Sequence, residues 1–173
     1  MTRRDPGGRP TVFDKLPALP EGKWVAVGRL DYNTSGLLLL TDSGELANLL
    51  MHPRYGLERE YAVRVQGGLD AQQLKTLRDG VPIDGEPARF ERIEAAERAA
   101  EGINRWYRAT LTEGRNREVR RLIEAVGRRV SRLIRVRYGS QELPRDLDAG
   151  HWRELPAASV ATLERIAKEA KIR

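Results

Sequence analysis

The side chains of this sequence that are best placed for chemistry lie in a polar turn bounded by two glycines. Residues 28–36 read Gly-Arg-Leu-Asp-Tyr-Asn-Thr-Ser-Gly, and Asp31 is the one carboxylate among them. Four leucines at positions 37–40 follow directly and predict a buried strand. Loops held by a rigid element are places where proteins present reactive groups. Asp31 is therefore a candidate catalytic carboxylate, and capping of the turn is its alternative role.

A helix over residues 117–128 carries the second candidate. Apolar residues recur there at positions i, i+3, i+4 and i+7, as Val119, Leu122, Ile123 and Val126, and Gly127 suits the end of the helix. The spacing turns Arg121 and Arg128 toward solvent or a ligand and places Arg120 at the flank of the stripe. A half-buried guanidinium at that flank needs an anion, which Asp31 would supply. An ordinary amphipathic helix with a solvated arginine edge has the same pattern.

Arginines are concentrated in one part of the sequence. Between Arg115 and Arg137 there are nine arginines and two glutamates, a local charge of +7 against +6 for the whole chain. A basic patch of this kind favours a polyanionic partner, most simply a nucleic acid. Arg115 and Arg117 precede the helix, whose first N–H groups would add to a phosphate site. A solvated charged face is the alternative.

An alternating segment at residues 57–65 predicts a strand with Tyr61, Val63 and Val65 on one face. A tyrosine in this position is usually part of the core. Next to a carboxylate and an arginine, however, an aromatic ring would offer a surface on which a base can stack.

The remaining elements predict an α+β fold with a mixed, largely antiparallel sheet flanked by helices. Further strands are expected at residues 23–27, 37–41, 88–96, 103–112 and 130–138, with a turn at Glu101 and Gly102 joining two of them. Further helices are expected after Ser43, from Asp70 to Gly80, and over residues 157–172.

Composition excludes several classes of protein. There is no cysteine, which excludes disulfides and thiolate metal sites and suits the cytoplasm. His52 and His151 lack the spacing of metal ligands, so no metal site is expected. No apolar run approaches the roughly 20 residues of a membrane span.

Taken in order, these motifs resemble those of the ribosomal small-subunit-type pseudouridine synthases. Residues 28–41 resemble the catalytic signature of that family. Residues 59–61 resemble a second motif, in which a basic residue precedes the active-site tyrosine by two positions. Residues 114–122 resemble a third, whose arginine falls at Arg120, and residues 131–139 resemble the segment after it. The resemblance extends over about residues 5–155.

The resemblance implies the pseudouridine synthase catalytic fold and the isomerisation of a specific uridine in ribosomal RNA, with base flipping and without cofactor or metal. It implies that Asp31, Tyr61 and Arg120 are catalytic: Tyr61 stacks on the flipped base and Arg120 pairs with Asp31. Leu133 would pack under the pocket. RNA contacts are implied for Arg29, Arg115, Asn116, Arg117, Arg121 and Arg135.

Residues 8–14 and 102–107 are most similar to family members that modify large-subunit RNA, so 23S rRNA is the expected partner of a cytoplasmic monomer. Family members usually begin with a small RNA-binding domain and a strand with a Lys-Pro motif. Without these, residues 1–22 are expected to form an arm and residues 23–173 an isolated catalytic domain. Three alternatives stay open: a related enzyme for 16S small-subunit rRNA, a non-catalytic rRNA-binding or assembly module, and a structural domain in which Asp31 caps its turn.

Overall fold

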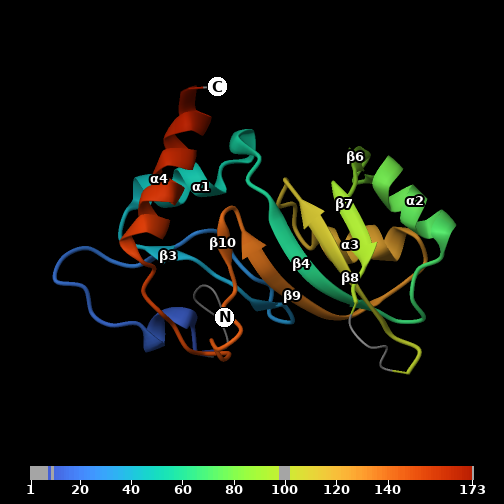
Figure 1. Ribbon diagram of the computed structural model, residues 1–173, viewed down its shortest axis with the longest axis horizontal. Coiled ribbons are helices and arrows are strands. Elements are labelled where there is room, and N and C mark those ends of the chain that lie inside the picture. Colours follow the sequence, from blue (N-terminus) through green and yellow to red (C-terminus); the bar gives the residue numbers. More distant parts are fainter. Residues whose placement is uncertain (1–7, 9, 98–101, 173) are drawn as a thin grey trace. The chain divides into compact units, whose positions relative to one another are not determined.

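The computed structural model describes residues 8, 10–97 and 102–172 (Figure 1). These residues form two compact units. One consists of the residues before Glu58 and after Val136, and the other is the continuous segment Glu58–Val136. The chain passes between them at Leu57 and again within the long strand β9 (Val130–Tyr138).

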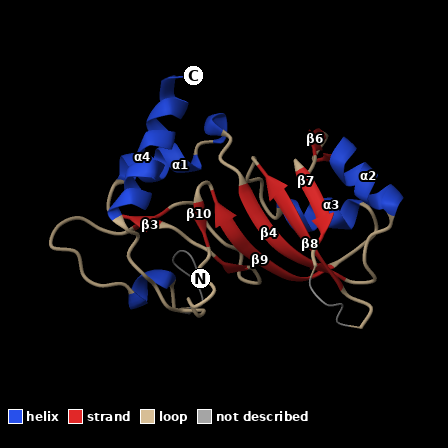
Figure 2. Cartoon of the chain, viewed as in Figure 1, coloured by secondary structure: helices blue, strands red, loops and turns tan. Residues whose placement is uncertain are grey.

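The sheet of the continuous unit is antiparallel where β4 (Arg59–Val65), β8 (Arg105–Leu111) and β7 (Arg92–Ala95) pair (Figure 2). The register places Tyr61 opposite Ala109, and β9 lies along the other side of β4. The predicted strands at residues 88–96 and 103–112 are therefore present, although β7 is shorter than expected. Of the predicted turn between them, Glu101 lies outside the described residues.

Two helices cover one face of this sheet, α2 (Ala71–Asp79) and α3 (Glu118–Ala125). Asp70 caps α2 and accepts the N–H of Gln73 at 2.7 Å, which confirms the predicted start of that helix. The buried core joins the apolar residues of both helices to alternate residues of the strands; its members include Val63, Val65, Leu77, Tyr107, Ala109, Leu111, Val119, Leu122 and Ile123. Tyr61 packs against this core, on the face that the alternation predicted.

A short hairpin in this unit was not expected from the sequence. Strand β5 (Val81–Ile83) pairs with β6 (Glu86–Ala88), and Pro82 lies opposite Pro87. The two turn residues, Asp84 and Gly85, both have positive φ, at 55° and 82°. Asp-Gly in a two-residue turn is a strong hairpin signal, but two prolines and a length of three residues conceal the strands.

The other unit has its own core. Strand β1 (Val25–Ala26) pairs with β3 (Leu40–Thr41), and α1 (Gly44–Met51) packs against α4 (Ala157–Ile172) (Figure 1). Short elements complete it: β2 (Ser35–Gly36), β10 (Gln141–Glu142) and two 3-10 turns, η1 (Val12–Lys15) and η2 (Pro53–Tyr55). Its core includes Val27, Leu37, Leu39, Ala47, Leu50, Tyr138, Leu163 and Ala167.

The predicted strand over residues 37–41 is correct only at its end. Leu37 and Leu39 are buried in the core, but the strand consists of Leu40 and Thr41 alone. A run of leucines reports burial, whereas a strand also requires a ladder partner, and β1 is only two residues long. The predicted loop at residues 1–22 contains the turn η1.

The end of α3 offers a test of the backbone. Gly127 follows the C-cap and has φ +75°, with no atom within 4 Å of the place where a Cβ would stand. Gly127→Ala should therefore lower the free energy of unfolding by about 1–2 kcal/mol through backbone strain alone. Gly44→Ala is the matched control, since Gly44 begins α1 in equally open space without a positive φ. Urea unfolding measures both, and equal effects would contradict the assignment.

Candidate active site

Asp31 lies in the turn that the sequence singled out. The Thr34 N–H donates to the Asp31 carbonyl at 2.9 Å, which closes the turn. Gly28 and Gly36, at its two ends, have φ of +79° and +108°, which explains why glycine occupies both places. The Asp31 side chain is 22 % exposed, and its Oδ1 lies 3.9 Å from an Nη of Arg29, a much more exposed residue. The turn thus presents a fixed, accessible carboxylate with a cation beside it.

In the continuous unit, α3 and the sheet position the other predicted catalytic residues. Arg120 is only 7 % exposed, and one Nη donates to the carbonyl of Val130 at 3.3 Å. Tyr61 on β4 is partly buried, and Leu133 on β9 is buried in the same core. The structure therefore brings Tyr61, Leu133 and α3 together. The pairing of Arg120 with Asp31, which belongs to the other unit, stays a prediction.

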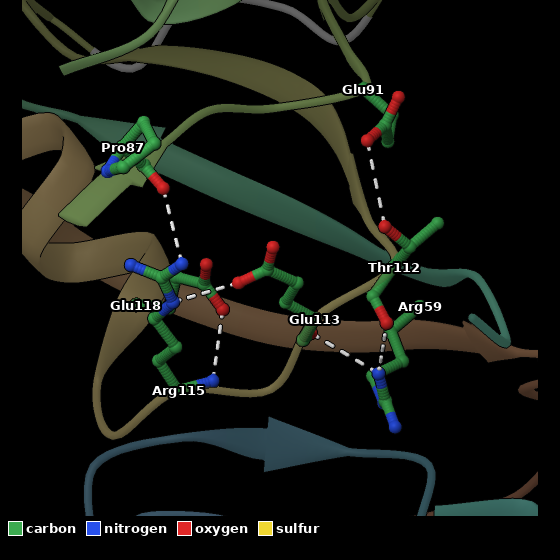
Figure 3. A network of polar contacts seen from close by, with 7 residues as sticks. All are labelled: Arg59, Pro87, Glu91, Thr112, Glu113, Arg115 and Glu118. Atoms are coloured by element: carbon green, nitrogen blue, oxygen red, sulfur yellow. Dashed lines mark hydrogen bonds and ion pairs between the residues drawn. The ribbon is translucent and has the colours of Figure 1, made fainter. Parts of the chain in front are cut away.

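The segment that leads into α3 is held by a network of polar contacts (Figure 3). Arg59, the first residue of β4, is 7 % exposed, and one Nη donates to the carbonyls of Thr112 and Glu113 at 2.8 and 3.1 Å. The Thr112 hydroxyl lies 3.5 Å from the carboxylate of Glu91. A buried arginine thus binds two successive carbonyls just after β8 ends.

Glu118 closes the other side of this segment. Its Oε2 accepts the backbone N–H of Arg115 at 2.9 Å, and its own N–H donates to the Arg115 carbonyl at 3.3 Å. Between them Arg117 adopts the left-handed conformation, φ 52° and ψ 29°, at the N-cap of α3 and makes no side-chain cap bond. That conformation costs a residue other than glycine about 1–2 kcal/mol, so the surrounding contacts must hold it.

The predicted RNA-binding residues divide into exposed and engaged groups. Asn116 and Arg117 are exposed. Arg115 is instead bound within the protein: its Nε pairs with Glu113 at 2.7 Å, and an Nη donates to the Pro87 carbonyl at 3.1 Å (Figure 3). The sequence had suggested that N–H groups at the start of α3 would add to a phosphate site. The Arg115 N–H is not available for this, because Glu118 already accepts it.

Two further arginines between Arg115 and Arg137 are also paired or buried, so they are not part of a solvated charged face. Arg121 pairs with Asp84 of the hairpin turn at 2.5 Å, which lowers the pKa of that exposed carboxyl. Arg135 is 3 % exposed, because it shares the inward face of β9 with Leu133. A surface contact between Arg135 and phosphate is therefore not what the structure shows.

Glu118 should make stability depend on pH. Burial, followed by the charge of Glu113, raises its pKa above the usual value of 4.5, while the Arg115 N–H and the charges of Arg115 and Arg59 act in the opposite direction. The folded chain therefore binds this proton more tightly than the unfolded chain, and the contribution of Glu118 to stability falls as pH rises above about 4.5.

Glu118→Gln removes this titration. Its free energy of unfolding, measured in urea from about pH 4.5 to about pH 7, should fall less steeply with pH than that of the wild-type chain. Parallel curves for the two proteins would contradict the raised pKa.

Sequence reasoning missed two residues of this region. Arg59 was recognised as a basic residue near Tyr61 but given no role, and Glu118 was given none. The contacts of Arg59 join positions 53 and 54 residues apart, which no local pattern reveals. For Glu118 a signal existed, since an acidic residue in the first turn of a helix commonly binds backbone N–H groups.

Among the described residues there is no group of three or more histidine or carboxylate side chains that could hold a metal ion. The helices in the described ranges are also too short or too polar for any of them to cross a membrane.

The sheet with its two helices agrees with the family comparison. The family model for RNA pseudouridylate synthase matches residues 8–125, more than half of the chain, and the chain belongs to this family. A crystal structure of a pseudouridylate synthase is similar with a TM-score of 0.77 and 27 % identity, over 89 % of this chain and 65 % of that one. The predicted family and α+β fold are confirmed.

Individual relatives are more similar still. The ribosomal large subunit pseudouridine synthase B of Yersinia pestis is 63 % identical over 154 residues, which is 89 % of this chain and 48 % of that protein. The protein of the same name from Escherichia coli (strain K12) is 59 % identical over 165 residues, 95 % of this chain and 56 % of that protein. The chain thus spans about half the length of the curated relatives it matches.

Proposed function

We propose that this chain carries the catalytic centre of an enzyme that converts a specific uridine of 23S ribosomal RNA into pseudouridine. The observation that carries the proposal is the position of the Asp31 turn inside the family match, in a chain 63 % identical to a relative named for the large ribosomal subunit. The excess of arginine over glutamate between Arg115 and Arg137 supports an RNA substrate.

The reaction needs no outside reactant. The bond between N1 of uracil and C1′ of the ribose breaks, and a bond forms between C5 and C1′. The C5 proton is lost and N1 gains one, so that the product is an isomer. Because the reacting atoms lie within the stacked RNA, the uridine must first flip out, at a cost of a few kcal/mol.

Each proposed role follows from the chemistry of the side chain. Asp31 acts at C1′, as the nucleophile or as the charge that supports cleavage of the glycosidic bond. In this proposal Tyr61 stacks on the flipped base and also accepts the C5 proton. Arg120 pairs with Asp31, which keeps the carboxylate ionised and oriented. Leu133 packs beneath the base and excludes water.

The proposed RNA contacts are those that the surface leaves available. Arg29, Asn116 and Arg117 are exposed and suit phosphate or ribose oxygens. Arg121 can contribute if it exchanges Asp84 for a phosphate. We further propose that the protein acts as a monomer in the cytoplasm, which fits the lack of cysteine.

The proposal is tested on ribosomal RNA from a strain that lacks the corresponding synthase. After incubation with the purified chain, chemical labelling of pseudouridine followed by sequencing should reveal new modification in 23S RNA and none in 16S RNA. Modification confined to 16S RNA would favour the small-subunit alternative. RNA that is bound but stays unmodified would favour the non-catalytic alternative.

A further inference from the structure

We propose that Arg59 and Glu118 are positioning residues of the active site, which hold residues 112–117 in the conformation that places Arg120. The inference rests on the proposed function, because it assigns Arg120 to the reaction. Neither residue is proposed to touch the RNA. Both are buried, with exposed fractions of 7 % for Arg59 and 4 % for Glu118.

Arg59 fixes the start of this segment. It stands two residues before Tyr61 on β4, and its Nη bridges the carbonyls of Thr112 and Glu113 at 2.8 and 3.1 Å. These carbonyls lie beyond the last residue of β8, Leu111, where the strand ladder ends. The guanidinium therefore ties the end of one strand to the beginning of its neighbour (Figure 3). Because the guanidinium donates inside the protein, Arg59 suits positioning rather than phosphate binding.

Glu118 fixes the end of the segment. Its carboxylate accepts the Arg115 N–H at 2.9 Å while its own N–H donates to the Arg115 carbonyl, so two bonds join positions 115 and 118. Arg115 is further held by Glu113 and by the Pro87 carbonyl. Helix α3 begins at Glu118, and Arg120 follows two residues later. The direction in which Arg120 leaves the helix is thereby set by Glu118.

The design of this helix start points to function. A serine, threonine or aspartate at the N-cap would satisfy the first N–H groups of a helix with one exposed side chain. Here the N-cap is Arg117 in a strained left-handed conformation, and two buried charged side chains hold the segment around it. Strained backbone that is held by its surroundings is typical of sites where a side chain must be placed accurately.

The experiment compares Arg59→Met, Glu118→Ala and Glu118→Gln with the wild-type chain. Arg108→Met is the matched control, because the largely exposed Arg108 on the adjacent strand pairs with Glu60 rather than with the segment. Three quantities are measured: the single-turnover rate at saturating RNA, the Kd for RNA, and hydrogen exchange of the amides of residues 114–120.

We expect Arg59→Met and Glu118→Ala to lower the rate at saturating RNA by about 10- to 100-fold, the effect of displacing a catalytic group by about 1 Å. Their Kd for RNA should change by less than about threefold, and exchange at residues 114–120 should accelerate. Glu118→Gln keeps an oxygen acceptor for the Arg115 N–H and should recover most of the rate. Arg108→Met should behave as wild type in all three measurements.

The inference is overturned if folded Arg59→Met and Glu118→Ala proteins keep the wild-type rate, or if they lose RNA affinity instead of rate. Equal loss in Glu118→Gln and Glu118→Ala would also overturn it. Two different measurements separate the two proposals. If the wild-type chain does not isomerise uridine, the proposed function fails. If hydrogen exchange at residues 114–120 is unchanged in the variants, the positioning role is rejected. Should Arg59→Met fail to fold, the Glu118 pair gives the same decision.

Discussion

Asp31→Asn is expected to abolish isomerisation while leaving the protein folded and bound to RNA. Asparagine has the shape of aspartate but neither its charge nor its nucleophilicity, and loss of such a group lowers the chemical rate by about 10³-fold or more. The turn itself should persist, because it is closed by the backbone bond from Thr34 to Asp31. The Arg29–Asp31 ion pair is long and partly exposed, so its loss costs at most about 1 kcal/mol.

The three readouts of this variant separate the open alternatives. An RNA-binding module without catalysis would show no activity in the wild-type chain either. If Asp31 had only a structural role, Asp31→Asn would instead lower the free energy of unfolding, and activity would be lost only to the extent that the protein unfolds. Removal of a negative charge close to RNA should leave the Kd unchanged or slightly lower. A fully active Asp31→Asn protein would contradict the role of Asp31.

Arg120→Met carries the second large effect. Arg120 is buried, and its Nη satisfies the Val130 carbonyl, so methionine leaves that carbonyl without this donor. Stability should fall by about 1–3 kcal/mol, and the rate at saturating RNA by about 10²-fold or more, because the charge that we propose orients Asp31 is lost. Arg120→Lys should recover only part of the rate, since lysine lacks the planar fork. Arg78→Met, at an exposed position on α2, is the control.

The pairing of Arg120 with Asp31 is tested by combining the two variants. If the side chains interact, the unfolding free energies of Asp31→Asn, Arg120→Met and the double variant should show a coupling of at least about 1 kcal/mol. Additivity to within about 0.5 kcal/mol is expected of residues that share no contact and would contradict the pairing.

Much of the fold could be predicted from hydrophobic periodicity. Strand β9 and helix α4 have the predicted bounds, and the buried stripe of α3 is that of the 3.6-residue repeat. Two local features were not predicted correctly. The leucines at positions 37–39 are buried without forming a strand, because burial alone does not provide a ladder partner. The hairpin of β5 and β6 was missed because its prolines resemble a loop.

The residues of the candidate site could be predicted only where a short-range sequence pattern identifies them. Asp31 stands out because glycine punctuation and a leucine run surround it, and the helical repeat placed Arg120 at the edge of the core, where it is buried. The engagement of Arg115 with Glu113 and Pro87, and the burial of Arg135, depend on contacts and packing beyond the local pattern. An arginine-rich segment therefore predicts an RNA partner better than it predicts which arginines remain available to it.

The most direct test of the central claim is the release of tritium from RNA that carries uridine labelled at C5. Formation of the C5–C1′ bond requires loss of the C5 hydrogen, so each isomerised uridine delivers one label to water. The wild-type chain should release label from a 23S RNA segment, up to a plateau that counts the modified uridines, and Asp31→Asn should release none. Label retained by the wild-type chain at saturating concentration, or released equally by both proteins, would contradict the account.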